Sequence, residues 1–235
     1  MARANFSDMS IIIPTLDEAG NIGRLIKELI GLYKGCRIIV ADDGSTDGTK
    51  EIVRKMGERG GNVSLLDRSN SAIHGLTASV IDASSHVGTS KIVVMDGDLQ
   101  HPASKVLELY QGLDKYDMAI GVRTEVRDWG AYRTIISKGM AYLAFFVFKL
   151  RGKAVCNDLM SGFFGMRTKV LKKIIKDNRN GFVYTGYKIL LDVLRLSGNS
   201  VSRCEIPYPT FHKRVAGKSK LEAKQMADVL ISIFK

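Results

Sequence analysis

The sequence predicts an α/β fold in which a mainly parallel sheet carries helices on both faces. Short apolar runs of strand length recur along the first half of the chain, and segments with apolar residues at helical spacing lie between them. Apolar strands joined by helical crossovers are typical of parallel sheets buried on both faces. Turn-forming and acidic residues follow several of these runs, and ligands of such sheets bind at the carboxyl ends of the strands.

The individual elements follow from these patterns. Five apolar runs predict strands at residues 9–13, 37–41, 63–66, 92–95 and 118–122, the first of them ended by Pro14. Helical spacing predicts a helix between the first two strands and another after the second; the residues concerned are Ile22, Leu25, Ile26, Leu29, Ile30 and Tyr33, then Ile52, Val53 and Met56. Right-handed crossovers are the default for such units.

The rest of the chain is expected to extend the same domain. After residue 122 the regular alternation weakens, but no linker, repeat or low-complexity tract separates the two parts. We therefore expect a single domain over residues 1–235, with halves at 1–122 and 123–235. Its length allows a substantial core without disulfides. The three cysteines form no disulfide or zinc pattern, which favours a reducing, cytosolic compartment, and no signal peptide or membrane-spanning stretch is evident.

The positive charge is concentrated in the second half. The whole chain carries a net charge of +11, with a net −3 in residues 1–120 and +14 in residues 121–235. A basic face attracts the phosphates of nucleic acid, anionic lipid or a polyphosphate substrate. The charge alone does not choose among these partners, and a merely solubilising surface explains it equally well.

The segment GMAYLAFFVF, residues 139–148, is an apolar run with Lys138 and Lys149 at its ends. Ten residues are too few to span a bilayer as a helix. An aromatic helix flanked by cations can lie in the membrane interface. An ordinary buried helix would have the same composition, so both interpretations stay open at this point.

Two acidic clusters follow expected strands. Asp96, Gly97 and Asp98 come directly after the strand at 92–95, and Gln100 adds a neutral oxygen. Two carboxylates with a glycine between them can bind one hard cation that shares its shell with phosphates, although Asp and Gly also form ordinary turns. The other cluster, residues 41–49, follows the strand at 37–41, and residues 14–21 end the first strand similarly. The three loops are expected to line one crevice.

The four histidines lack metal-ligand spacing and are expected to be structural or exposed; they are His74, His86, His101 and His212.

The motifs IIIPTLDEAGN, ADDGSTDGT and VVMDGDLQHP, in this order and spacing, resemble family 2 glycosyltransferases of the GT-A (Rossmann-like) fold. The second half narrows the resemblance to polyprenyl-phosphate sugar synthases, the dolichol-phosphate mannose synthases especially. The segments that carry it are GVR at 121–123, WGAYR at 129–133, DLMSGFF at 158–164 and GKSK at 217–220. The resemblance covers nearly the whole chain, and DLQHP and SGFF are its most specific elements.

The resemblance implies that the half at 1–122 binds the nucleotide sugar and the half at 123–235 the acceptor lipid phosphate. It also implies the roles of individual residues. The nucleoside of a sugar nucleotide, GDP-mannose by preference, would be held by Pro14, Leu16, Glu18, Ala41 and Asp43, and its diphosphate by Asp96, Gly97, Asp98 and Gln100. Asp96, Asp98 and Gln100 would bind Mg²⁺ or Mn²⁺, while Arg123, Arg214 and Lys220 would neutralise phosphate charge. Arg133 and Ser137 would meet the acceptor phosphate, so that Asp96, Asp98, Arg123 and Arg133 are the expected catalytic residues. Leu16 stands where the family usually has an aromatic residue, and no role is assigned to residues 72–78.

The resemblance implies sugar transfer to a lipid phosphate, and two anionic substrates agree with the positive charge of the second half. A lipid monophosphate has a second pKa of about 6, so it is an anionic nucleophile near neutral pH and needs no general base. Asp158 is therefore expected to orient neighbouring arginines or the loop around Ser161. The lipid acceptor favours an interfacial role for residues 139–148 and for other amphipathic helices of the second half. We expect a peripheral protein on the cytoplasmic face of a membrane, or one cut before a membrane anchor, with no nucleic-acid partner.

Three alternatives stay open. Another sugar nucleotide, UDP-glucose above all, could serve as donor to a polyprenyl phosphate. A nucleotidyltransferase would also use a metal-bound diphosphate but would release pyrophosphate. A non-enzymatic basic protein would bind nucleic acid or membrane through residues 121–235 in a salt-sensitive manner.

Overall fold

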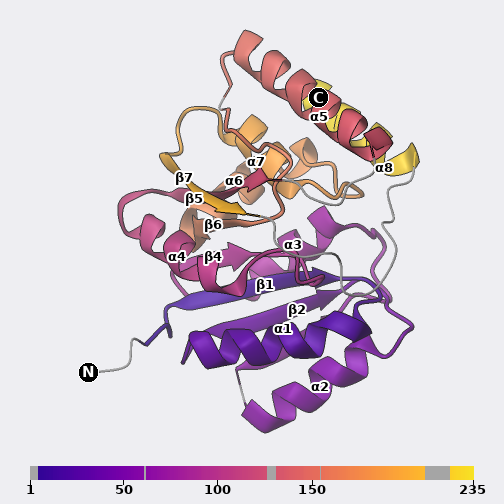
Figure 1. Cartoon of the computed structure of the whole chain (residues 1–235), viewed down its shortest axis with the longest axis vertical. Helices are drawn as coiled ribbons and strands as arrows, with labels where there is room; N and C mark the ends of the chain where they lie inside the picture. The colour runs from indigo at the N-terminus through magenta and orange to yellow at the C-terminus, as the bar shows by residue number, and fades with distance from the viewer. Residues whose placement is uncertain (1–4, 61, 126–130, 154, 210–222) are drawn as a thin grey trace.

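The computed structural model describes residues 5–60, 62–125, 131–153, 155–209 and 223–235 (Figure 1). Seven strands form one sheet in the order β3-β2-β1-β4-β6-β5-β7. The strands are β1 Met9–Thr15, β2 Arg37–Asp42, β3 Val63–Asp67, β4 Lys91–Val94, β5 Met118–Glu125, β6 Phe164–Arg167 and β7 Arg203–Pro209. The helices are α1 Ala19–Leu32, α2 Thr49–Gly60, α3 Leu76–Ser85, α4 Val106–Lys115, α5 Ala131–Leu150, α6 Thr168–Asp177, α7 Ile189–Ser197 and α8 Ala223–Phe234, with short 3₁₀ turns at Ala103–Lys105 and Arg179–Gly181.

The sheet is mainly parallel, as predicted, with one reversed strand. β1 pairs in parallel with β2 and β4, β2 with β3, and β5 with β7. β6 runs antiparallel to both of its neighbours, β4 and β5. The N-terminal end of β6 therefore lies at the same edge as the carboxyl ends of β4 and β5. This reversal brings the loop before β6 to the edge where ligands of parallel sheets bind.

Helices cover both faces of the sheet. Successive residues of a strand point to opposite faces, and in β1 Ile12 packs into one hydrophobic cluster while Ile11 and Ile13 pack into the other. The cluster with Ile11 and Ile13 includes residues of α1 and α4. The cluster with Ile12 includes residues of α3, α5, α6, α7 and α8. Figure 1 shows α1 and α2 on one side of β1 and β2, and α5 beside α8 at the far end of the molecule.

The five predicted strands are all present, and their ends differ by a few residues. β1 continues through Pro14 to Thr15. The last residue of β1 that pairs with β4 is Ile12, so Pro14 lies beyond that ladder and its missing N–H removes no hydrogen bond there. β5 is longer than predicted because its pairing with β7 continues to Glu125.

The second half contains elements that the apolar pattern did not predict. β6 and β7 complete the sheet, and the apolar run 139–148 lies inside α5. Within the described residues, no helix is long and apolar enough to cross a bilayer.

Candidate functional site

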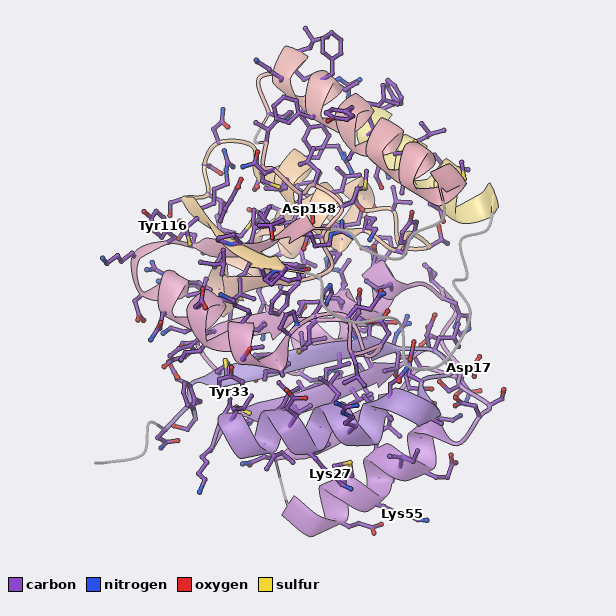
Figure 2. The ribbon with its side chains drawn as sticks, viewed as in Figure 1. Asp17, Lys27, Tyr33, Lys55, Tyr116 and Asp158 are labelled. Carbon is purple, nitrogen blue, oxygen red and sulfur yellow. The ribbon has the colours of Figure 1, made fainter. Side chains whose placement is uncertain are left out.

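The loops after β1 and β2 are bonded to each other at the carboxyl edge of the sheet. Three backbone N–H groups donate from the first loop to the second: Asp17 to Ser45 Oγ (2.8 Å), Glu18 to Thr49 Oγ1 (2.9 Å) and Ala19 to Asp47 Oδ2 (2.9 Å). Figure 2 labels Asp17 at this edge, beside the ends of the strands. The first two predicted loops are therefore one connected structure.

Asp42, the last residue of β2, and Asp43, which follows it, have different partners. The Asp42 carboxylate is buried and accepts the N–H of Ser45 (2.8 Å) and the hydroxyl groups of Ser45 (2.5 Å) and Thr15 (3.1 Å). Asp42 therefore stabilises the turn. The Asp43 carboxylate, whose side chain is 11% exposed, accepts the N–H of Gly75 (2.7 Å) and contacts the Arg68 guanidinium. Asp43 is thus held by residues that follow β3, whereas Asp42 is held by its own turn and by β1.

Arg68 fixes Asp43 from the end of β3. The side chain is 3% exposed, and its guanidinium donates to Asp43 Oδ1, Ser79 Oγ (2.8 Å) and Asp82 Oδ2 (2.8 Å), and also to the carbonyl oxygen of Ile73 (2.7 Å). His74 Nδ1 lies 3.1 Å from Asp43 Oδ1. Residues 72–78, which the sequence left without a role, therefore hold Asp43 in place.

We expect Arg68→Met to lower the free energy of unfolding by about 3 kcal/mol, because it leaves a nearly buried carboxylate without its partner. Arg54→Met is the matched control, because Arg54 is 49% exposed and pairs with Asp67 at the surface; it should change stability by no more than about 0.5 kcal/mol. Urea denaturation followed by circular dichroism measures both. Equal effects of the two substitutions would contradict the role of Arg68.

The loop after β4 carries the second acidic cluster, residues 96–100, and we call it the acidic loop. The Asp96 side chain is 32% exposed, whereas Asp98 is buried and its Oδ1 accepts the N–H of Gln100 (3.1 Å). Leu99 has a φ of 64° and Asp17 a φ of 54°, and they are the only described residues other than glycine with positive φ. Left-handed backbone at such residues is uncommon and clusters at ligand-binding loops. A Cβ at Gly97 would lie 3.1 Å from Thr15 Cγ2, so this loop touches the end of β1.

A bidentate ion pair faces this loop from β5. Arg123 Nε donates to Asp158 Oδ2 (2.6 Å) and Arg123 Nη2 to Asp158 Oδ1 (2.7 Å). Burial opposes the charge of Arg123, but the bonds to Asp158 outweigh it and raise the pKa of the guanidinium. The Asp158 carbonyl accepts the N–H of Ser161 (3.1 Å). Asp158, labelled in Figure 2, thus contacts both the arginine and the loop that it was expected to orient.

Two charged or polar residues of this edge were not singled out from the sequence. Burial, and then the positive charge of Arg123, lower the pKa of Lys188 to about 8, while Asp96, Asp158 and Asp98 act in the opposite direction. Lys188 immediately precedes α7 and lies close enough to Asp96 and Asp98 to interact electrostatically with their carboxylates. His101, expected to be structural or exposed, is also buried here, and its burial lowers its pKa. A lysine at the start of a helix carries no sequence signal, whereas His101 stood within the DLQHP motif.

The other predicted site residues divide into three groups. Pro14 and Ala41 are buried in the sheet, next to the connected loops, while Leu16 is 41% exposed and Glu18 and Gln100 are partly exposed. Arg133 and Ser137 belong to α5, and their side chains lie outside the described part of the structure. Arg214 and Lys220 lie outside the described residues altogether.

The acidic loop suits a divalent cation whose remaining coordination positions are filled by a bound phosphate ligand and water. No cluster of three or more His, Cys, Asp or Glu side chains suited to a metal ion occurs among the described residues. Asp96 and Asp98 supply hard carboxylate oxygens from one loop. Mg²⁺ is usually held by one or two carboxylates together with phosphate oxygens and water, and this donor set suits that arrangement.

An exposed apolar surface lies at the far end of the domain. We define the α5–α8 face as Tyr142, Phe145, Phe146 and Leu150 of α5 with Leu230, Ile231 and Phe234 of α8, all of them exposed. The two helices pack against each other. Exposed basic residues border the face, namely Lys149, Arg151, Lys153 and Lys235. Ala144 and Phe148, on the other side of α5, are buried, so this helix is neither wholly buried nor wholly exposed.

The sequence matches known proteins over most of its length. The family model described as Glycosyl transferase family 2 matches residues 10–175. A dolichol-phosphate mannosyltransferase of Saccharomyces cerevisiae is 31% identical over 95% of this chain and 84% of the relative. One of Mycosarcoma maydis is 32% identical over 92% of this chain and 74% of the relative. One of Pyrococcus furiosus is 31% identical over 97% of this chain, which spans 63% of that longer relative.

Solved structures match the fold. A glucosyl-3-phosphoglycerate synthase from Mycobacterium tuberculosis, in complex with Mn²⁺, uridine diphosphate and phosphoglyceric acid, aligns with a TM-score of 0.69 and 18% identity, covering 96% of this chain and 78% of that one. A mannosyl-3-phosphoglycerate synthase from Rubrobacter xylanophilus aligns with a TM-score of 0.66 and 15% identity, covering 96% and 72%. The architecture is therefore the GT-A fold.

Proposed function

The chain belongs to glycosyltransferase family 2, and we propose that it transfers mannose from GDP-mannose to dolichyl or another polyprenyl phosphate. One observation carries the proposal. The acidic loop of Asp96 and Asp98 and the pair of Arg123 and Asp158 meet at one edge of the sheet, where a diphosphate would find both a cation site and a guanidinium. The names of the relatives that are about 31% identical support the choice of substrates.

The donor would lie across the connected loops. Asp43, held by Arg68 and Gly75, would offer carboxylate oxygens to the nucleoside. Pro14, Leu16, Glu18 and Ala41 are proposed to form the neighbouring wall. The diphosphate would reach Asp96, Gly97, Asp98 and Gln100. Mg²⁺ or Mn²⁺ on these residues would supply positive charge to the departing nucleoside diphosphate. Arg123, and Arg214 and Lys220 from the second half, would neutralise the remaining phosphate charge.

The acceptor supplies its own nucleophile. A phosphate monoester is largely dianionic near pH 7, so the protein need not remove a proton. Its task is to hold two anionic substrates together and in line. Arg133 and Ser137 are proposed to bind the acceptor phosphate, and Lys188 adds positive charge beside the acidic loop. Attack from the face opposite the leaving group inverts the anomeric carbon.

The lipid acceptor resides in a membrane, and we propose that the α5–α8 face docks on the cytoplasmic surface of one. Aromatic and aliphatic side chains with basic residues at the border are typical of interfacial helices. The run 139–148 supplies Tyr142, Phe145 and Phe146 to this face. The protein would then be peripheral and would have no nucleic-acid partner.

The double substitution Phe146→Ser with Ile231→Ser is expected to weaken binding to vesicles containing anionic lipid by about 10-fold or more. Phe146 and Ile231 are 60% and 50% exposed, and each would bury apolar area in the interface. The matched control is Ile30→Ser with Leu32→Ser on α1, which are 41% and 47% exposed. Vesicle co-sedimentation measures the effect. Equal loss from both double variants would place the contact elsewhere.

The activity is tested with labelled GDP-mannose, a polyprenyl phosphate, Mn²⁺ or Mg²⁺ and lipid. A lipid-soluble labelled product together with free GDP is the expected result. Product from UDP-glucose but not from GDP-mannose would replace the donor, and release of pyrophosphate would replace the reaction class. No product from any donor, over varied lipids and metals, would overturn the proposal.

A further inference from the structure

Two motifs of the sequence have no part in the contacts proposed above. They are His101, which follows the acidic loop, and the SGFF segment at 161–164. The structure brings them together, because the His101 ring stacks on Phe163 with centroids 5.0 Å apart and an interplanar angle of 14°. Tyr208 of β7 packs edge-on against both rings. The loops before β6 and after β4 thus meet in one aromatic cluster with Tyr208 of β7.

The His101 side chain is hydrogen-bonded to the backbone of the acidic loop. Its Nδ1 accepts the N–H of Asp96 at 3.1 Å, so that nitrogen carries no proton and the neutral ring is protonated on Nε2. Nε2 lies 3.7 Å from Asp96 Oδ2. One ring therefore contacts both the backbone and the carboxylate of Asp96, and the stack on Phe163 fixes the plane of that ring.

Gly162, of the SGFF segment, contacts the same Asp96 carboxylate. A Cβ at Gly162 would lie 2.8 Å from Asp96 Oδ2 and 2.9 Å from Oδ1, closer than real side chains approach. The Asp96 carboxylate therefore packs directly against the backbone of Gly162. Only glycine permits this position of the carboxylate, which explains the glycine of the SGFF segment in terms of contact.

We propose that His101 and Gly162 are positioning residues that hold the Asp96 carboxylate in the orientation that binds the metal ion and diphosphate. The inference rests on the proposed function. Asp98 is buried and its Oδ1 accepts the N–H of Gln100, whereas the Asp96 side chain is about one-third exposed and is contacted by His101 and Gly162. Groups that orient a metal ligand typically contribute 10–100-fold to metal affinity or activity.

Titration of free Mn²⁺ by electron paramagnetic resonance, on the full chain with saturating GDP, tests the inference directly. We expect His101→Leu and Gly162→Ala each to weaken GDP-dependent Mn²⁺ binding by about 10–100-fold. His101→Asn should remain within about threefold of the unsubstituted chain, because its Oδ1 can accept the Asp96 N–H where Nδ1 did. Gly88→Ala is the matched control, since a Cβ there meets no atom within 4 Å.

A purely structural role would give a different pattern. If the pair positions Asp96, the apparent KM for Mn²⁺ rises in Gly162→Ala while the KM for the polyprenyl phosphate stays constant. Wild-type Mn²⁺ affinity in both His101→Leu and Gly162→Ala, with normal binding by the unsubstituted chain, would overturn the inference alone. Absence of GDP-dependent Mn²⁺ binding by the unsubstituted chain would overturn the proposed function, and the inference with it. If His101→Leu fails to fold, Gly162→Ala decides.

Discussion

Asp98→Asn is expected to lower mannosyl transfer by about 10³-fold or more while leaving the fold intact. The substitution keeps an oxygen that can accept the N–H of Gln100, and it removes the negative charge that a divalent cation requires. Loss of the cation would deprive the leaving diphosphate of several kcal/mol of stabilisation, and about 4 kcal/mol corresponds to 10³ in rate. The labelled GDP-mannose assay measures the rate, and circular dichroism checks the fold.

The control for this substitution is Asp114→Asn. Asp114 pairs with Lys91 at the surface and its side chain is 61% exposed, so its neutralisation should alter the rate by less than about twofold. Transfer by Asp98→Asn at a rate within tenfold of the unsubstituted chain would show that Asp98 is not part of the catalytic machinery.

The second large effect concerns the pair of Arg123 and Asp158. Their side chains are 18% and 9% exposed, and removing one partner of such a pair leaves a desolvated charge. Arg123→Met and Asp158→Leu should each lower the free energy of unfolding by about 3–5 kcal/mol. Replacing both by apolar residues removes both charges, so the double variant should regain most of the lost stability.

Activity separates the two functions of the pair. We expect the double variant to have nearly the same free energy of unfolding as the unsubstituted chain, measured by urea titration. It should nevertheless transfer mannose at least about 10²-fold more slowly, because Arg123 is proposed to contact the donor diphosphate. Recovery of activity along with stability would mean that Arg123 only supports the fold.

The first half of the fold followed from the sequence because its strands are apolar on both faces. The runs at 37–41 and 118–122 correspond to β2 and β5. β6 is only four residues long, and β7, RCEIPYP, contains charged residues and two prolines. Neither has the continuous apolar character of a central parallel strand, so only their pairing with neighbours identifies them.

The acidic loops were predictable, but the groups that fix them were not. The motifs selected Asp43 and Asp96 at strand ends, but no pattern indicated the hydrogen bond from the N–H of Gly75 that holds Asp43. Arg68 and Lys188 act from other segments across the sheet. Such contacts depend on the strand order, for which no local pattern provides a signal.

The reversed strand also has a consequence for synthesis of the chain. Ile92, Val93 and Val94 of β4 pair on one side with residues of β6 that follow about 70 positions later. At roughly 5–20 residues per second, the ribosome needs on the order of several seconds to supply them. During that interval β4 is an unprotected apolar edge strand, the kind of segment that invites aggregation. A fragment ending at residue 122 would keep that edge permanently, so we expect this fragment to be poorly soluble on its own.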